Sequence, residues 1–185
     1  MRGGSHIATG VASAAVIADS YLLLHSHPIG SVANNISVIV SDFALSTQIP
    51  MFLHIPVCVM FYLFGLILPD IDSPYSMIGK IMYLPIPHRT WTHCWLPLLL
   101  TAIGSIWFKP LFFLGLGIFI HLFFDSFSAS GVNWFYPIKT KHVCRLYHTS
   151  QPTEYIFATI FVVMSVIYSG FVLQHVYHIF DFFLK

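Results

Sequence analysis

Charged residues are scarce in this chain of 185 residues, at 8% of the total, whereas 57% of the residues are hydrophobic. Ordinary soluble domains carry roughly 25% charged residues. A small soluble domain leaves too much of its surface wet to hide so much apolar side chain. The scarcity excludes a typical water-soluble domain, and the formal net charge of +1 gives no support for a nucleic-acid partner. We therefore predict an integral membrane protein.

Cysteine is also scarce, with 3 residues and no Cys-x-x-Cys spacing. This pattern excludes a disulfide framework and a zinc finger. We interpret Cys58 and Cys144 as small apolar fillers, and we note that Cys94, beside His93, could lie near a metal. The chain also lacks internal repeats and low-complexity tracts, so we treat residues 1–185 as a single membrane-embedded domain.

Long apolar runs are what the chain has in place of charge. A spanning helix needs about 20 residues, so the first, second and fifth runs are long enough to cross a membrane. The third and fourth are shorter and meet at Lys109-Pro110, which predicts a tight helical hairpin. The fold class is therefore all-α, a polytopic bundle of about five spanning or half-spanning helices. The runs are Ile7–Leu24, Met51–Leu68, Cys94–Phe108, Pro110–Phe124 and Tyr155–Leu173.

The first run could mimic a signal peptide, but its apolar character resumes at Tyr21, so we expect a retained helix. It also carries Asp19, which we expect to pair with another polar group. The connection His25–Pro50 holds a short apolar stretch, Ile36–Val40, which would form a strand or lie at the membrane interface.

Lysine and arginine set the expected orientation, because they concentrate in cytoplasmic loops. With five spans, Lys109 and Lys185 fall on one side of the membrane. The opposite side, which we predict to be cytoplasmic together with the N-terminus, holds Arg2, Lys80, Arg89, Lys139, Lys141 and Arg145.

On this topology, histidines and aspartates gather at the cytoplasmic ends of the helices. His121 and Asp125 are four residues apart, which places both on one helix face. Asp70 and Asp72 would repel unless a cation or proton lay between them. Imidazole and carboxylate together suit Zn²⁺, Mn²⁺ or Fe²⁺. The cytoplasmic group comprises His6, Asp70, Asp72, His88, Arg89, His93, His121 and Asp125.

Structural roles remain open as alternatives for these residues. The two acids that follow the second run could lie in a solvated loop, His121 and Asp125 could form an intrahelical pair, and Arg89 could bind lipid headgroups. His93 could cap a helix, and His6 could be an ordinary polar residue. His142 and His148 lie in a cytoplasmic loop, where they could form a lid or contact substrate. We expect interfacial or structural roles for His25, His27, His54, His175 and His178.

Five ordered motifs resemble the YdjM-type membrane-bound metal-dependent hydrolases. They are Gly4-Ser5-His6-Ile7-Ala8-Thr9-Gly10, Leu68-Pro69-Asp70-Ile71-Asp72-Ser73, His88-Arg89-Thr90-Trp91-Thr92-His93, His121-Leu122-Phe123-Phe124-Asp125 and Gly131-Val132-Asn133-Trp134-Phe135-Tyr136-Pro137. The resemblance implies a bacterial inner-membrane hydrolase, in some bacteria part of the LexA-controlled SOS response, with a likeness to zinc-dependent phospholipase C. Ser73 stands where that family pattern has His or Asn, which leaves the number of metal ions open.

These observations lead to a functional hypothesis. We expect a divalent metal, with Zn²⁺ favoured over Mn²⁺ and Fe²⁺, as one or two ions at the cytoplasmic interface. Arg89 would stabilise a phosphate, and His88 would protonate a leaving group or orient a ligand. Membrane lipids surround the site, and the expected substrate is a phosphoester, lipid-linked or free. A metal or proton transporter and a non-catalytic protein with a structural metal are the rival hypotheses. The expected metal ligands are His6, Asp70, Asp72, His93, His121 and Asp125.

Overall fold

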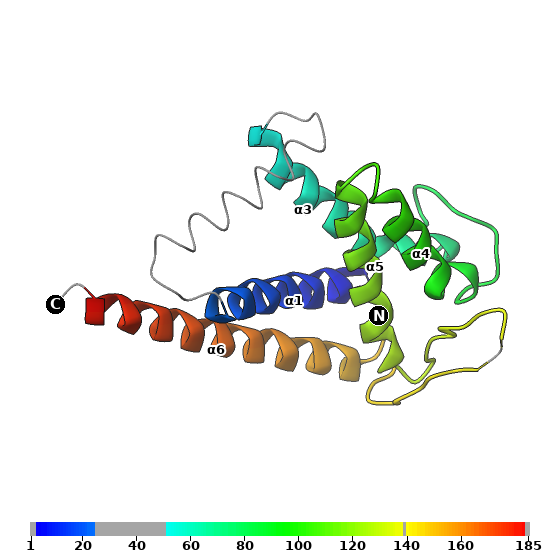
Figure 1. The fold of residues 1–185 in the computed structure, drawn as a ribbon. Helices are drawn as coiled ribbons and strands as arrows, with labels where there is room; N and C mark the ends of the chain where they lie inside the picture. The colour runs from blue at the N-terminus through cyan, green and yellow to red at the C-terminus, as the bar shows by residue number, and fades with distance from the viewer. Residues whose placement is uncertain (1–2, 25–50, 139, 184–185) are drawn as a thin grey trace.

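The computed structural model describes residues 3–24, 51–138 and 140–183. Within these ranges the chain is helical, with no strand, and the elements pack as a bundle (Figure 1). The predicted all-α class is confirmed, whereas the expectation for Ile36–Val40 lies outside the described residues. The helices are α1 (Gly3–Leu24), α3 (Met51–Ile67), α4 (Trp95–Gly104), α5 (Pro110–Ser126) and α6 (Pro152–Phe183), with 3₁₀ turns η1 (Leu68–Asp72) and η2 (Trp91–His93).

Three described helices are long and apolar enough to cross a membrane, at Gly3–Leu23, Ile55–Asp72 and Pro152–His175. The predicted hairpin forms from α4 and α5, although α4 ends at Gly104 rather than at Phe108. The 10 residues of α4 rise about 15 Å, which is half the thickness of a bilayer's hydrocarbon core. This hairpin therefore accounts for the half-spanning part of the bundle.

The last helix is longer than its apolar run, because α6 continues to Phe183. We expected the helix to end with its apolar run at Leu173, before His175 and His178, and this is wrong because both histidines lie within α6. The run ended at Leu173 because Gln174 and His175 lower the local hydropathy, but neither residue breaks a helix.

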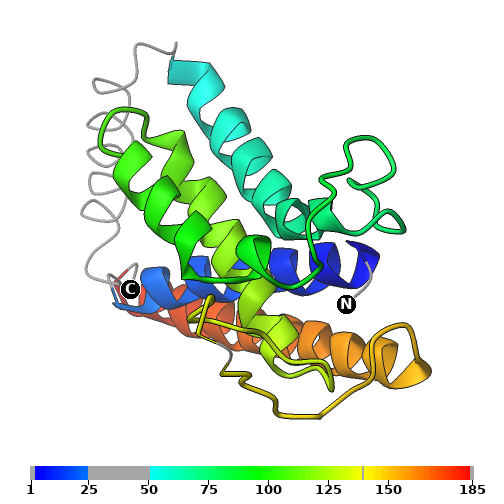
Figure 2. The ribbon, with the colours of Figure 1, turned by 90° about the vertical axis from the view of Figure 1, so that its right-hand side faces the viewer.

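A polar contact joins α1 to α6, which lie side by side (Figures 1 and 2). Ser169 donates a hydrogen bond to Asp19, and the Ser20 and Tyr168 hydroxyls lie 3.0 Å apart. The expectation that Asp19 pairs with a polar group is confirmed. Such interhelical hydrogen bonds hold membrane helices together where apolar contact alone cannot distinguish protein from lipid.

Two glycines bring α3 and α5 into backbone contact. A Cβ atom on Gly65 would lie 2.3 Å from the Leu114 carbonyl oxygen, and one on Gly117 would lie 2.3 Å from the Tyr62 carbonyl oxygen. Small residues allow this close approach in membrane bundles. One turn further along, His121 Nδ1 donates a 2.7 Å hydrogen bond to the Leu66 carbonyl oxygen, which fixes the register of the two helices at the site.

Replacing either contact glycine should therefore destabilise the protein. Alanine normally favours a helix over glycine by about 1 kcal/mol, but overpacking at Gly65 or Gly117 should cost about 1–3 kcal/mol. Thermal unfolding in detergent should show lower midpoints for Gly65→Ala and Gly117→Ala. Gly170→Ala is the matched control, because no described atom lies within 4 Å of its added Cβ. An unchanged midpoint for both contact variants would mean that the helices are not this close.

Candidate metal centre

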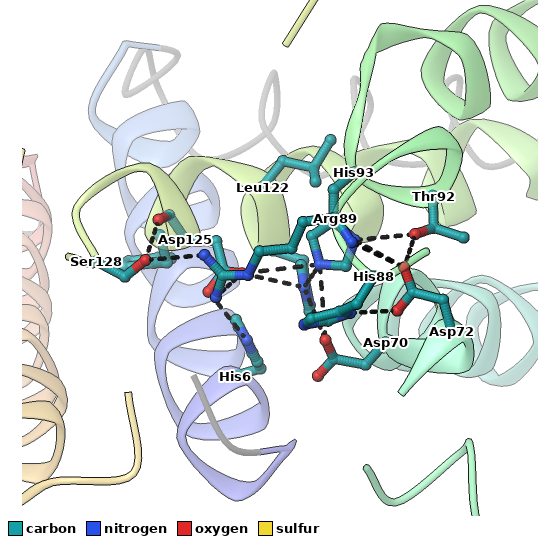
Figure 3. A network of polar contacts seen from close by, with 12 residues as sticks. His6, Asp70, Asp72, His88, Arg89, Thr92, His93, Leu122, Asp125 and Ser128 are labelled. Carbon is teal, nitrogen blue, oxygen red and sulfur yellow. Dashed lines mark hydrogen bonds and ion pairs between the residues drawn. The ribbon is translucent and has the colours of Figure 1, made fainter. Parts of the chain in front are cut away.

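The structure brings together all eight residues of the predicted cytoplasmic group. Figure 3 labels each of them except His121. His6 lies near the start of α1, Asp70 and Asp72 lie in η1 beyond α3, and His93 ends η2. His121 and Asp125 lie near the end of α5. These helix ends and turns lie at the same end of the bundle, and this brings the polar side chains together.

Four ligand atoms form the centre of the group, and we call them the ligand core: His93 Nε2, His121 Nε2, Asp70 Oδ1 and Asp125 Oδ2. The two imidazole nitrogens are 3.4 Å apart. Asp70 Oδ1 lies 3.6 Å from His93 Nε2 and 3.7 Å from His121 Nε2. Asp125 Oδ2 lies 3.7 and 4.0 Å from the same nitrogens.

These separations fit a divalent cation. Tetrahedral ligands of Zn²⁺ at their usual bond lengths lie about 3.4 Å from one another. The donor types, imidazole nitrogen and carboxylate oxygen, are also those that zinc, manganese and iron accept. His121 Nδ1 donates to the Leu66 carbonyl, so its Nε2 lone pair faces the core. The described residues thus include His/Asp groups that could hold a metal ion.

The local sequence explains how the two η1 acids reach the core. Pro69 near the start of η1 has no N–H to continue the α-helical ladder, and α3 tightens into a 3₁₀ turn there. Ser73 N then donates to the Asp70 carbonyl oxygen at 3.0 Å and closes the turn. Asp70 and Asp72 are both buried as a result.

Asp72 is surrounded by hydrogen-bond donors. It accepts from His88 Nδ1 at 2.6 Å, from Thr92 Oγ1 at 2.5 Å and from Arg89 N at 3.1 Å. Its Oδ2 also lies 3.6 Å from His93 Nδ1. A carboxylate behind two histidines orients their rings and fixes their tautomers. The arrangement favours this orienting role for Asp72 over the ligand role that we expected from the sequence.

The Arg89 guanidinium contacts three residues at the edge of the core. Its backbone φ of 63° is left-handed, a conformation that is rare for a residue with a side chain. Nη1 donates to the Gly131 carbonyl at 2.7 Å and to Ser128 Oγ at 3.2 Å. Nη2 lies 3.1 Å from Asp125 Oδ2. The arginine therefore fixes Asp125 and ties the 127–151 connection to the core.

Burial and neighbouring carboxylates shift the pKa values of two groups beside the core. Burial alone would lower the pKa of His93, but its contacts with Asp70 and Asp72 raise that pKa above the usual value. On the other side, burial raises the pKa of the Tyr147 phenol, and the Asp125 and Glu154 carboxylates raise it further. Tyr147 therefore stays protonated and donates to the Phe124 carbonyl oxygen at 2.8 Å.

Sequence reasoning missed several residues that support the site. Thr92 lies within the His88–His93 motif, but residue spacing does not predict that its hydroxyl donates to Asp72. Ser128 and Gly131 contact Arg89 from a loop with no periodic pattern. Glu154 is fully buried and accepts from Ser150 N at 2.6 Å, which is typical of a carboxylate at a helix N-terminus.

Other expected residues lie apart from the core. His142, His148 and His175 are exposed, and none of them contributes to the described metal-ligand groups. Cys94 is buried, and its thiol donates to the Trp91 carbonyl at 3.3 Å. Burial raises the pKa of the Cys94 thiol above its usual value.

Comparison with known proteins completes the description of the site. No curated protein and no solved structure matches the chain. A family model described as YdjM inner membrane protein matches residues 1–179, which includes every residue of the ligand core. The chain therefore belongs to the YdjM inner membrane protein family.

Proposed function

We propose that the protein is a divalent-metal-dependent hydrolase that acts on a phosphoester at the cytoplasmic interface of the bacterial inner membrane. The observation that carries this proposal is the ligand core. Its atoms come from η1, η2 and α5, the two imidazole nitrogens lie 3.4 Å apart, and each carboxylate oxygen lies 3.6–4.0 Å from both nitrogens. Imidazole and carboxylate ligands suit Zn²⁺, Mn²⁺ and Fe²⁺. Zn²⁺ is the favoured ion because the separations match its tetrahedral geometry, and Mn²⁺ and Fe²⁺ are the alternatives.

The proposed chemistry assigns a task to each part of the site. A divalent cation lowers the pKa of water toward about 7 and polarises a phosphoryl oxygen. Asp72 keeps the His88 and His93 rings oriented through the hydrogen bonds described above. Arg89 fixes Asp125 and places a positive charge where negative charge would develop on phosphate oxygens.

The location of the core supports an enzyme over the rival hypotheses. A transporter site usually lies near the membrane midplane in broken helices, whereas these residues lie at helix ends and continue into loops. A purely structural metal has a closed ligand shell. The His88 side chain is 42% exposed, so the group opens to solvent on one side.

Loss of core ligands should remove metal and activity together. Asp70→Ala and His121→Ala should each lower metal content or turnover by about tenfold or more, because each ligand fixes the geometry for the others. Elemental analysis and hydrolysis of a synthetic phosphodiester and of phospholipid micelles measure these effects. His175→Ala is the control, compared at equal yield and equal detergent elution. Full metal in both core variants would contradict the site, and metal without any hydrolysis would favour the transport or structural hypothesis.

Cysteine labelling should place the core on the cytoplasmic side. Cys144 is exposed in the 127–151 connection, so a variant that retains it alone should react with an impermeant maleimide only after the membrane is opened. Trp107, 75% exposed in the α4–α5 turn, gives the matched position on the other side. Trp107→Cys in a cysteine-free background should react in intact cells. The reverse labelling pattern would invert the topology that the Lys/Arg distribution predicts.

A further inference from the structure

The site residues divide into two sets of equal composition, each with two histidines and one aspartate. We call His6, His121 and Asp125 the α1–α5 set, and Asp70, His88 and His93 the loop set. Within each set, one ligand atom from every residue lies within 4.8 Å of the others. Two histidines and one carboxylate form a recurrent metal-binding triad.

His6 is the observation that a single ion leaves unexplained. Its ring is 1% exposed and stacks on His121 with centroids 3.8 Å apart. Neither ring nitrogen has a hydrogen-bond partner among the residues that the structure describes. Nε2 lies 3.5 Å from Asp125 Oδ1, longer than a good hydrogen bond. Leaving a buried polar group without a partner costs about 1–3 kcal/mol, so a histidine kept here points to a ligand.

His88 is the exposed member of the loop set. Its Nδ1 is bound to Asp72 at 2.6 Å, which leaves Nε2 as the atom that can reach a ligand. The His88 and His93 rings lie 5.1 Å apart, close to edge-on at 81°. A carboxylate behind a histidine is the usual support for a metal-binding imidazole. This geometry favours a ligand role over the proton-donor role that we expected for His88.

The carboxylates of Asp70 and Asp125 lie between the two sets. Asp70 Oδ1 is 3.6 Å from His93 in its own set and 3.7 Å from His121 in the other. Asp125 directs Oδ1 toward His6 and Oδ2 toward His93, at 3.5 and 3.7 Å. Carboxylates in this position can serve cations on both sides.

We propose that the cluster is a dinuclear centre, in which the α1–α5 set holds one divalent cation and the loop set holds a second. The proposal rests on the metal-dependent function proposed above and deepens it. With neutral histidines, Asp70, Asp72, Asp125 and Arg89 give the cluster two net negative charges. Two divalent cations would leave about two positive charges, which suits a phosphate group with about two negative charges at neutral pH.

Metal stoichiometry tests the proposal without any activity measurement. The full-length protein is stripped of metal in detergent and reloaded with Mn²⁺, and bound manganese is counted per chain. We expect about two ions in the unmodified protein, about one in His6→Ala and about one in His88→Ala. His142→Ala and His175→Ala, both at exposed positions, should retain about two.

Electron paramagnetic resonance gives a second measurement on the same samples. The unmodified protein should show the spectrum of a spin-coupled manganese pair, and either single variant should show isolated Mn²⁺. About one uncoupled ion in the unmodified protein would overturn the dinuclear proposal while leaving the metal-dependent function standing. Retention of two coupled ions in His6→Ala or His88→Ala would also overturn it, because the assigned sets would be wrong. A protein that binds no manganese, zinc or iron would overturn both proposals.

Discussion

The backbone contact between α3 and α5 is the constraint on which the site depends. Gly65 and Gly117 allow the two helices to touch, and this contact brings the Leu66 carbonyl within hydrogen-bond distance of His121. That hydrogen bond orients the His121 ring, and Asp125 follows one helical turn later. Without the small residues, the helices would separate by the width of a side chain, and the 3.7 Å between Asp70 Oδ1 and His121 Nε2 that suits a candidate cation site would be lost.

Burying ionisable groups costs free energy, and hydrogen bonds from the rest of the site offset that cost. Asp72 accepts three hydrogen bonds, and Arg89 spreads its donors over Asp125, Ser128 and Gly131. Isolated charges would be expensive in such surroundings. The long connections between helices therefore contribute to the centre as much as the helices do, because they bring the donors that keep its acids charged.

Much of the fold followed from the sequence because lipid imposes simple rules. Apolar runs gave the helices, and the polar residues at their ends gave the members of the site. Ring orientation could not be derived in the same way. Whether His88 acts as a proton donor or as a metal ligand depends on which ring nitrogen Asp72 binds. That contact is set by the geometry of loops between residues that are distant in sequence. The stacking of His6 on His121 likewise depends on how α1 crosses α5, which no periodic pattern records.

The polar face of α1 has a consequence for biosynthesis. This helix precedes α5 in the chain, so it is synthesised before α5 exists. Thr9 and Ser13 donate to carbonyl oxygens of their own helix, which allows them to enter lipid without partners. His6 has no such acceptor among the described residues, and it lies in the first turns of α1. Its imidazole stacks on His121 of α5, so this ring can reach its buried position only after α5 has been synthesised.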